Sequence, residues 1–169
     1  IATGGIDLSV GSLMAISGAL APLIFMGALF DLPHPMVGVA LAFVIPVLAA
    51  GAFGWFNGFL ITRYNIQPIV ATLVLFIAGR GIAQVMTNGS LQVFRVPEFQ
   101  FIGLGRVLGL PFQVILMIVV VALAAWAMRK TLFGRQILAA GGNEKAARLA
   151  GIPVDKVKRR VYMISGLCA

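Results

Sequence analysis

Long apolar runs set the limits on what this chain can fold into. Four of them cover residues 8–30, 37–61, 68–86 and 111–128, and a fifth begins near Val161 and continues to Ala169. A helix needs about 20 mainly apolar residues to cross the hydrocarbon core of a membrane. Lipid offers no partners for exposed backbone groups, so only helices and closed barrels can cross it. The runs lack the two-residue alternation of barrel strands, and each is therefore predicted to be a helix.

The low charge content supports a membrane protein over a soluble one. Of the 169 residues, 60% are hydrophobic and 11% are charged, and the mean hydropathy is +1.03. Soluble domains carry about 25% charged residues. We predict an all-α, multi-pass transmembrane helix bundle of about five helices, forming one domain over residues 1–169. The chain starts at Ile1 and stops inside an apolar run, so we expect a piece of a longer protein, incomplete at both ends.

The basic residues are concentrated in one segment. The formal net charge is +8, and nine of the thirteen Lys and Arg residues fall between Arg129 and Arg160. Cytoplasmic loops of membrane proteins carry such an excess of Lys and Arg. This reading is favoured over a nucleic-acid patch, so residues 129–160 are predicted to be a cytoplasmic loop. Residues 62–67 then also lie inside, and residues 31–36 and 87–110 lie outside.

A first polar constellation precedes the first apolar run. Residues 4–12 read GGIDLSVGS, with Asp7 and Ser9 at the start of the expected helix. Either side chain can cap the free N–H groups of a helix. A glycine pair beside a helix N-terminus resembles the broken helices that line transporter sites, and an acid near the membrane suggests function. Asp7 and Ser9 are therefore candidates for the substrate path, with a plain interfacial cap as the alternative.

A second constellation lies in the second and third runs. Arg80, Gln84 and Thr87 are spaced i, i+4 and i+7, so they share one helix face. A charged residue inside a membrane helix is expected to face the protein interior or a water-filled cavity. The alternative is a structural Arg that bonds backbone carbonyls or extends to the interface. The remaining polar candidates here are Asn57, Gln67 and Thr72.

A third constellation lies inside the basic loop. Asn143 is a suitable N-cap, and Gly151 is a suitable C-terminal stop with Pro153 just beyond it. Between them we predict a short helix of two turns, whose small side chains suit docking against a partner. The candidate docking residues are Gly142, Asn143, Glu144, Ala146, Ala147, Ala150 and Gly151.

Other motifs are absent or point to packing. The sequence has no phosphate-binding G-x-x-x-x-G-K-[ST] loop and no H-E-x-x-H, and Cys168 is its single cysteine. No metal site, no cofactor and no enzymatic activity are therefore expected of this chain, and His34 is read as a surface residue. Gly54 and Gly58 form a G-x-x-x-G pair that permits close packing of membrane helices.

The three constellations, in this order, resemble the permeases of ATP-binding-cassette sugar importers of the ribose type. The family's GGIDLSVGS-like segment is matched at residues 4–12, and its N-G…I-x-P…T-L…R-G stretch at residues 57–81. Its G-x-N…A-A…G-I loop is matched at residues 141–152. Within the family, residues 66–73 and 78–81 look most like the galactofuranose-type permeases.

The resemblance implies an inner-membrane permease that moves a monosaccharide by alternating access. It implies a cytoplasmic ATPase that hydrolyses ATP and grips the loop helix, and a second permease subunit, identical or different. It also implies a periplasmic sugar-binding protein and surrounding membrane lipid, and no nucleic acid. A neutral sugar needs hydroxyl and amide contacts along its path. The candidate path residues are Asp7, Ser9, Asn57, Gln67, Thr72, Arg80 and Gln84.

Three other functions remain open at this stage. A permease for a branched-chain amino acid or a nucleoside is one, although a charged solute would favour paired charges and only Asp7 and Arg80 are available. A secondary transporter would place several acids or broken helices at the membrane midplane. An integral-membrane enzyme would need acid–base or metal groups at membrane depth, and no such cluster is found.

Overall fold

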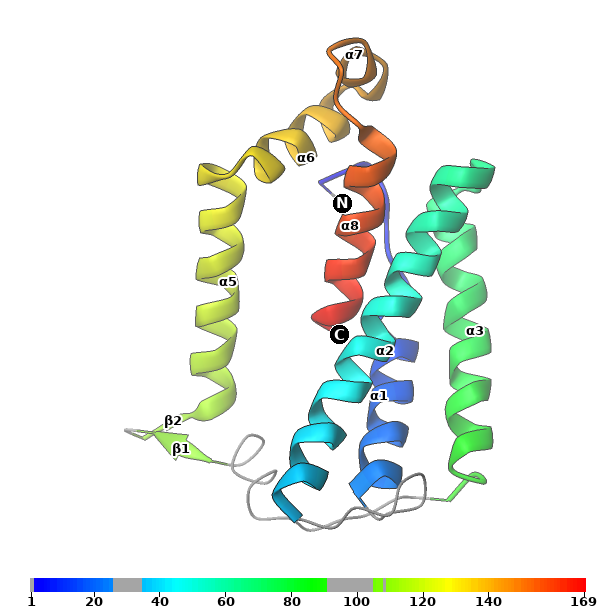
Figure 1. The fold of residues 1–169 in the computed structure, drawn as a ribbon, viewed down its shortest axis with the longest axis vertical. Coiled ribbons are helices and arrows are strands. Elements are labelled where there is room, and N and C mark those ends of the chain that lie inside the picture. The colour runs from blue at the N-terminus through cyan, green and yellow to red at the C-terminus, as the bar shows by residue number, and fades with distance from the viewer. Residues whose placement is uncertain (1, 26–34, 91–104, 108) are drawn as a thin grey trace.

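The computed structural model describes residues 2–25, 35–90, 105–107 and 109–169 (Figure 1). Residues 31–34 of the expected external loop at 31–36, with His34, lie outside these ranges, and so do the end of the first run and most of the stretch at residues 87–110. The described helices are α1 (Val10–Phe25), α2 (Pro35–Tyr64), α3 (Pro68–Met86), α5 (Phe112–Lys130), α6 (Leu132–Gly142), α7 (Glu144–Leu149) and α8 (Val154–Leu167). Strand β1 (Arg106–Val107) pairs antiparallel with β2 (Leu110–Pro111).

The helical membrane architecture predicted from the sequence is confirmed. Three described helices are long and apolar enough to cross a membrane, at Val37–Tyr64, Pro68–Met86 and Phe112–Lys130. Helix α1 is apolar but has 16 described residues. Figure 1 shows α1, α2, α3, α5 and α8 extending along the long axis, while α6 crosses one end of the bundle and α7 lies beyond it.

Two boundaries show how well the apolar runs predicted the helices. Helix α3 coincides with the predicted residues 68–86, because Pro68 occupies the first turn, where its missing N–H is not needed. Helix α8 begins at Val154, seven residues before the predicted start at Val161. Its first turns are amphipathic: Val154 and Val157 are buried, while Lys156 is exposed. The basic residues on the outer face interrupt the apolar run, so the apolar pattern did not predict these first turns.

Helix α6 is a further element that the sequence reading missed. It lies within the basic loop, and Thr131 caps it by accepting a hydrogen bond from the Gly134 N–H at 3.1 Å. Its inner face buries Gly134, Ile137 and Ala140. A Cβ atom on Gly134 would collide with the carbonyl oxygen of Met128. The absence of that atom allows the sharp turn between α5 and α6.

Helices α2 and α8 approach one another through glycines. A Cβ atom on Gly58 would lie 2.8 Å from the Cα of Arg159, and one on Gly54 would collide with the carbonyl oxygen of Tyr162. On α8, Gly166 lies equally close to the carbonyl of Ala50. The G-x-x-x-G pair therefore has the packing role expected for it.

The described apolar core joins α1, α2 and α3. Leu13 packs with Ala50 and Leu75 in one cluster, and Ile16, Ala19 and Ala83 form a second. Helix α5 differs, because none of its residues is buried. Figure 1 shows α5 standing apart from the other long helices, connected to α8 through α6 and α7. Most of the described packing therefore lies on the α1–α2–α3–α8 side.

We predict that Gly54→Leu destabilises the protein, because its side chain would meet backbone atoms of α8 that cannot rotate away. Overpacking of this kind costs about 1–3 kcal/mol. The matched control is Gly81→Leu, where a Cβ atom meets nothing within 4 Å. Thermal unfolding of the purified proteins in detergent should show a lower midpoint for Gly54→Leu alone. Equal midpoints for the two variants would contradict the α2–α8 contact.

Candidate functional site

Asp7 connects the segment before α1 to the far end of the chain. Its Oδ1 accepts hydrogen bonds from the Ser9 N–H at 2.9 Å and from the Ser9 hydroxyl at 2.6 Å. Its Oδ2 accepts a hydrogen bond from the Ser165 hydroxyl on α8 at 2.7 Å. Asp7 is thus more than a local cap, because one carboxylate orients the turn into α1 and also holds α8.

Three other predicted residues gather around this carboxylate. Ser9, Asn57 and Thr72 are 0%, 1% and 0% exposed. The Asn57 side-chain amide donates to the Ser9 hydroxyl at 3.3 Å. The Thr72 hydroxyl lies 2.9 Å from the Pro68 carbonyl oxygen and 3.5 Å from that of Ile6. We call Asp7, Ser9, Asn57, Thr72 and Ser165 the polar cluster; it joins the entry to α1 with α2, α3 and α8.

Two residues were not predicted: Ser165, which belongs to the polar cluster, and Tyr162, which lies one turn before it on α8. Ser165 donates to Asp7, and Tyr162 is 4% exposed with a hydroxyl that has no hydrogen-bond partner among the described residues. A Cβ atom on Gly5 would collide with that hydroxyl. The sequence carried one signal, since Tyr162 and Ser165 are polar residues three positions apart within the last apolar run and so share a helix face.

Arg80 and Gln84 lie at a different place. They line a cavity of about 340 Å³ between α1 and α3. The cavity is lined by Ala15, Gly18, Ala19, Arg80, Ala83, Gln84, Thr87 and Ser90. The Arg80 guanidinium lies 5.4 Å from the centroid of the Phe76 ring. Arg80, Gln84 and Thr87 share one helix face and line this cavity, and Arg80 and Gln84 are exposed. Gln67 lies exposed at the start of α3, away from this cavity.

The short helix of the basic loop has both predicted caps. The Asn143 Oδ1 accepts a hydrogen bond from the Ala146 N–H at 3.0 Å. At the other end Gly151 has φ +81°, and the N–H of Ile152 donates to the Ala147 carbonyl at 3.0 Å. This left-handed glycine and its backward hydrogen bond form a standard helix stop. The two caps thereby stabilise α7, a helix of six residues that would be only marginally stable by itself.

Ion pairs attach α7 to the start of α8. Arg148 pairs with Glu144 at 3.0 Å and with Asp155 at 2.5 Å, and Lys158 pairs with Glu144 at 2.7 Å. The Lys158 and Arg148 hydrogen bonds hold the pKa of the Glu144 carboxyl below its ordinary value. The Arg148 hydrogen bonds do the same to the pKa of Asp155. We call these four residues the loop network.

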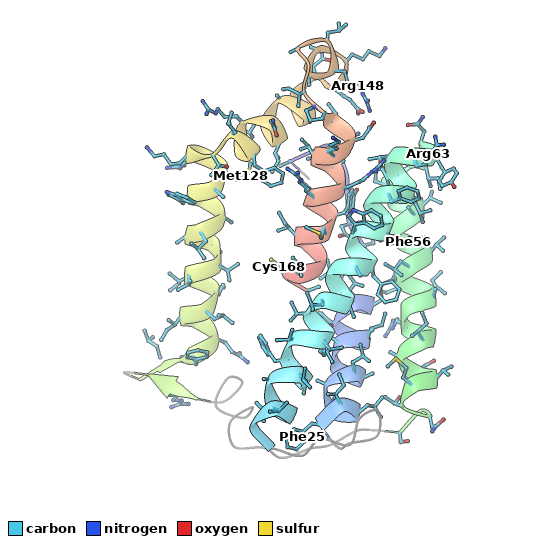
Figure 2. The ribbon with its side chains drawn as sticks, viewed as in Figure 1. Phe25, Phe56, Arg63, Met128, Arg148 and Cys168 are labelled. Atoms are coloured by element: carbon cyan, nitrogen blue, oxygen red, sulfur yellow. The ribbon has the colours of Figure 1, made fainter. Side chains whose placement is uncertain are left out.

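The structure corrects one part of the predicted docking face. Ala147 is 4% exposed and packs against Ala140 and Val154, so its side chain supports the loop internally. Ala146 and Ala150 remain exposed, and Leu149 beside them is 90% exposed. Spacing along the helix did not reveal which side would face α6 and α8. Figure 2 shows Arg148 at the same end of the molecule, well beyond the long helices.

Helix α8 connects the loop network to the bundle. The Arg159 Nε donates to the Thr62 hydroxyl on α2 at 2.7 Å, and its guanidinium lies 5.3 Å from the Phe59 ring centroid. Asp155 of the loop network and Ser165 of the polar cluster are ten residues apart on α8, a rise of about 15 Å. One helix therefore contacts both the exposed loop and the buried polar residues.

These features define a multi-pass α-helical membrane protein with a polar cluster inside its bundle and a capped helix outside it. The family model described as "Branched-chain amino acid transport system / permease component" matches residues 1–169, and the chain belongs to this family. It is thus a component of a transport permease, and the relatives described next are named as permeases rather than enzymes. Within the described residues, no three His, Cys, Asp or Glu side chains group as metal ligands.

Several curated relatives are named as sugar transporters. The galactofuranose transporter permease protein YtfT of Escherichia coli K12 is 41% identical over 169 residues, which is 100% of this chain and 47% of that protein. The ribose import permease protein RbsC of the same strain is 43% identical over 178 residues, covering 100% of this chain and 51% of that protein. The L-arabinose ABC transporter permease protein AraH of Azospirillum brasilense is 37% identical, covering 99% and 47%.

The chain spans about half the length of these relatives. No solved structure matches it. The resemblance to permeases of the ribose and galactofuranose type is confirmed by the family model and by these identities.

The lowered pKa values predict that acid releases α7 from α8. A carboxyl whose pKa is lowered on folding stabilises the fold above its ordinary pKa, and this contribution disappears as the pH falls through the lowered value. Each pair is partly exposed and contributes about 0.2–1 kcal/mol. Hydrogen-exchange protection of residues 144–150 should therefore decline from pH 5 to pH 2. Glu144→Gln combined with Asp155→Asn should have low protection throughout; a parallel decline in this variant would contradict the role of the pairs.

Proposed function

We propose that this chain forms the membrane-spanning part of an ATP-driven importer that moves a monosaccharide by alternating access. The observation that carries the proposal is the position of α8. It is ion-paired to α7 through Asp155 and hydrogen-bonded to the polar cluster through Ser165. A displacement of α7 would therefore be transmitted along a single helix to Asp7, which orients the entry to α1.

We propose that a separate cytoplasmic ATPase contacts α7 and supplies the energy for transport. The exposed residues Lys145, Ala146, Leu149 and Ala150 form the surface proposed for this contact. Leu149 is 90% exposed there and lies beside the exposed Ala146 and Ala150, so a protein partner would cover an apolar surface at this end of the molecule. Since the basic loop is expected inside the cell, the ATPase would approach from the cytoplasm, and ATP would be hydrolysed on that partner.

The proposed substrate path has two groups of polar residues, the polar cluster and the cavity lined by Arg80. The polar cluster includes Thr72 near the start of α3, and the cavity includes Gln84 near its end. These two residues are twelve positions apart, which corresponds to about 18 Å along a helix. The polar cluster offers hydroxyl, amide and carboxylate groups, and the cavity offers hydroxyl, amide and guanidinium groups. All of these groups can bond the hydroxyl groups of a neutral sugar. The relatives' names, which include ribose, galactofuranose and L-arabinose, support this substrate class.

The remaining partners follow from the same proposal. A second permease subunit, identical or different, would complete the path beside this chain. A periplasmic sugar-binding protein would deliver the substrate at the end of the bundle opposite α7, where the Arg80 cavity lies.

An amino-acid substrate is the second candidate, because the family description names branched-chain amino acids. A zwitterion would be held best by Asp7 and Arg80 together. These two residues lie at different sites. Asp7 contacts Ser9 and Ser165 in the polar cluster, whereas Arg80 lines the cavity toward the other end of α3. The separation favours the neutral sugar. A secondary transporter is disfavoured because, among the described acids, only Asp7 lies in the bundle.

We predict that Leu149→Asp weakens assembly with the ATPase and reduces transport, because a charge replaces the exposed apolar contact. Membrane insertion should be unchanged, since the Leu149 side chain is 90% exposed. Leu138→Asp is the control: it changes a leucine that is 57% exposed on α6, outside the proposed surface. Co-purification of the ATPase and sugar uptake would be measured together. Normal assembly and uptake in Leu149→Asp would contradict the docking role of α7.

We predict that Asp7→Ala reduces sugar uptake about tenfold or more while the protein still inserts and assembles. The variant loses hydrogen bonds from Ser9 and Ser165 to a charged acceptor, which contribute about 1.5–3 kcal/mol each. Ser17→Ala is the control, because its hydroxyl makes one long contact of 3.5 Å with the Pro46 carbonyl.

Uptake of labelled ribose, arabinose, galactose and leucine by cells with and without the gene tests the function itself. Leucine uptake without sugar uptake would replace the sugar proposal by the amino-acid one. Normal sugar uptake in Asp7→Ala would reduce Asp7 to a helix cap.

A further inference from the structure

An apolar groove lies between α5, α6 and α8. It has a volume of about 150 Å³. It is lined by Ala124, Ala127, Met128, Phe133, Gly134, Ile137, Val161 and Ile164, so no polar side chain faces it. Figure 1 shows α5 and α8 below α6 and apart from one another, and Figure 2 labels Met128 at the corner where α5 meets α6.

The walls below the groove are also apolar and uncovered. On α5, Met117, Val120 and Val121 lie three to seven positions before Ala124, on the same face, and are 43–60% exposed. No residue of this helix is buried. On α8, Ile164 and Leu167 are 42% and 37% exposed. Two facing apolar walls of this kind need an apolar occupant when the protein is in a membrane.

Four cations are close in sequence to residues that line the groove. Arg129 and Lys130 directly follow Met128, Arg135 follows Gly134, and Arg160 precedes Val161. All four are exposed. Among the described residues none of them has an ion-pair partner, because the ion pairs there involve Arg148 and Lys158. The described acids are engaged in the loop network or, in the case of Asp7, in the polar cluster.

The charge and the apolar surface are arranged in the same order on both walls. On α8, Arg160 lies one helical turn from Ile164, and on α5, Arg129 lies one to two turns from Ala124. A phospholipid has this order too, with a phosphate joined to acyl chains. Basic pockets between membrane helices on the cytoplasmic side bind acidic lipid headgroups.

We propose that this groove is a binding site for an anionic phospholipid. The phosphate would contact Arg129, Lys130, Arg135 and Arg160, and an acyl chain would lie in the groove between α5 and α8. The unpaired cations favour lipid over a protein occupant, because a protein segment would have to bring acidic side chains to the membrane interface. A free phosphate would leave the apolar walls uncovered. The site stands independently of the transported solute and of the ATPase.

The test is lipid retention by the purified protein, measured by native mass spectrometry with phosphatidylglycerol, phosphatidylcholine and glycerol phosphate as separate additions. We expect selective retention of phosphatidylglycerol. Changing Arg129, Arg135 and Arg160 together to Gln should weaken binding roughly 100-fold. Ala127→Trp keeps the cations and fills the groove, so it should weaken binding as well. The matched control is Lys145→Gln with Lys156→Gln, two exposed cations outside the groove, which should leave binding unchanged.

Several outcomes would overturn the proposal. Equal retention of both lipids, or an unchanged affinity in the triple Gln variant, would show that the cations do not bind the lipid headgroup. Equal binding of glycerol phosphate and lipid would leave a phosphate site without a groove. A photoreactive group placed at position 127 of the protein in its native membrane should react with lipid; reaction with protein, either a second copy or another segment, would assign the groove to that occupant.

Discussion

The close approach of α2 and α8 is the contact on which the rest of the arrangement depends. Gly54 and Gly58 leave no side chain between the two helices, and Gly166 leaves none on the opposite surface. This approach brings Ser165 within hydrogen-bonding distance of Asp7, and Arg159 within reach of Thr62. With larger side chains at these glycines, α8 would move outward and both contacts would be lost together.

The second constraint is that polar groups inside a membrane protein must find partners within it. The polar cluster meets this constraint with bonds among its own members, from Asn57 to Ser9 and from Ser9 and Ser165 to Asp7. Asn57 belongs to α2 and Ser165 to α8, whereas Asp7 and Ser9 lie together before α1, so the bonds also fix how these three segments sit relative to one another. The same carboxylate therefore serves architecture and, in the function proposed above, the response of the bundle to its loop.

Some elements were predictable because their cause is local. Helix α3 was predicted from its apolar length and from Pro68, and the ends of α7 from Asn143 and Gly151. Apolar length and capping act within a few residues, so a linear reading detects them. Helix α6 and the first turns of α8 escaped the same reading, because they are amphipathic and their basic faces interrupt any apolar run.

The sequence by itself determined the helical membrane class, the position of the basic loop and the identity of most residues in the polar cluster. The tertiary structure decided which of these residues meet. It placed Arg80 and Gln84 in a separate cavity and turned Ala147 inward. It also brought Ser165 into a hydrogen bond with Asp7, which is 158 positions away in the sequence. The physical reason is that burial and hydrogen bonding between distant segments depend on how helices rotate and pack, and that rotation is fixed by contacts such as the glycine interface rather than by any one segment.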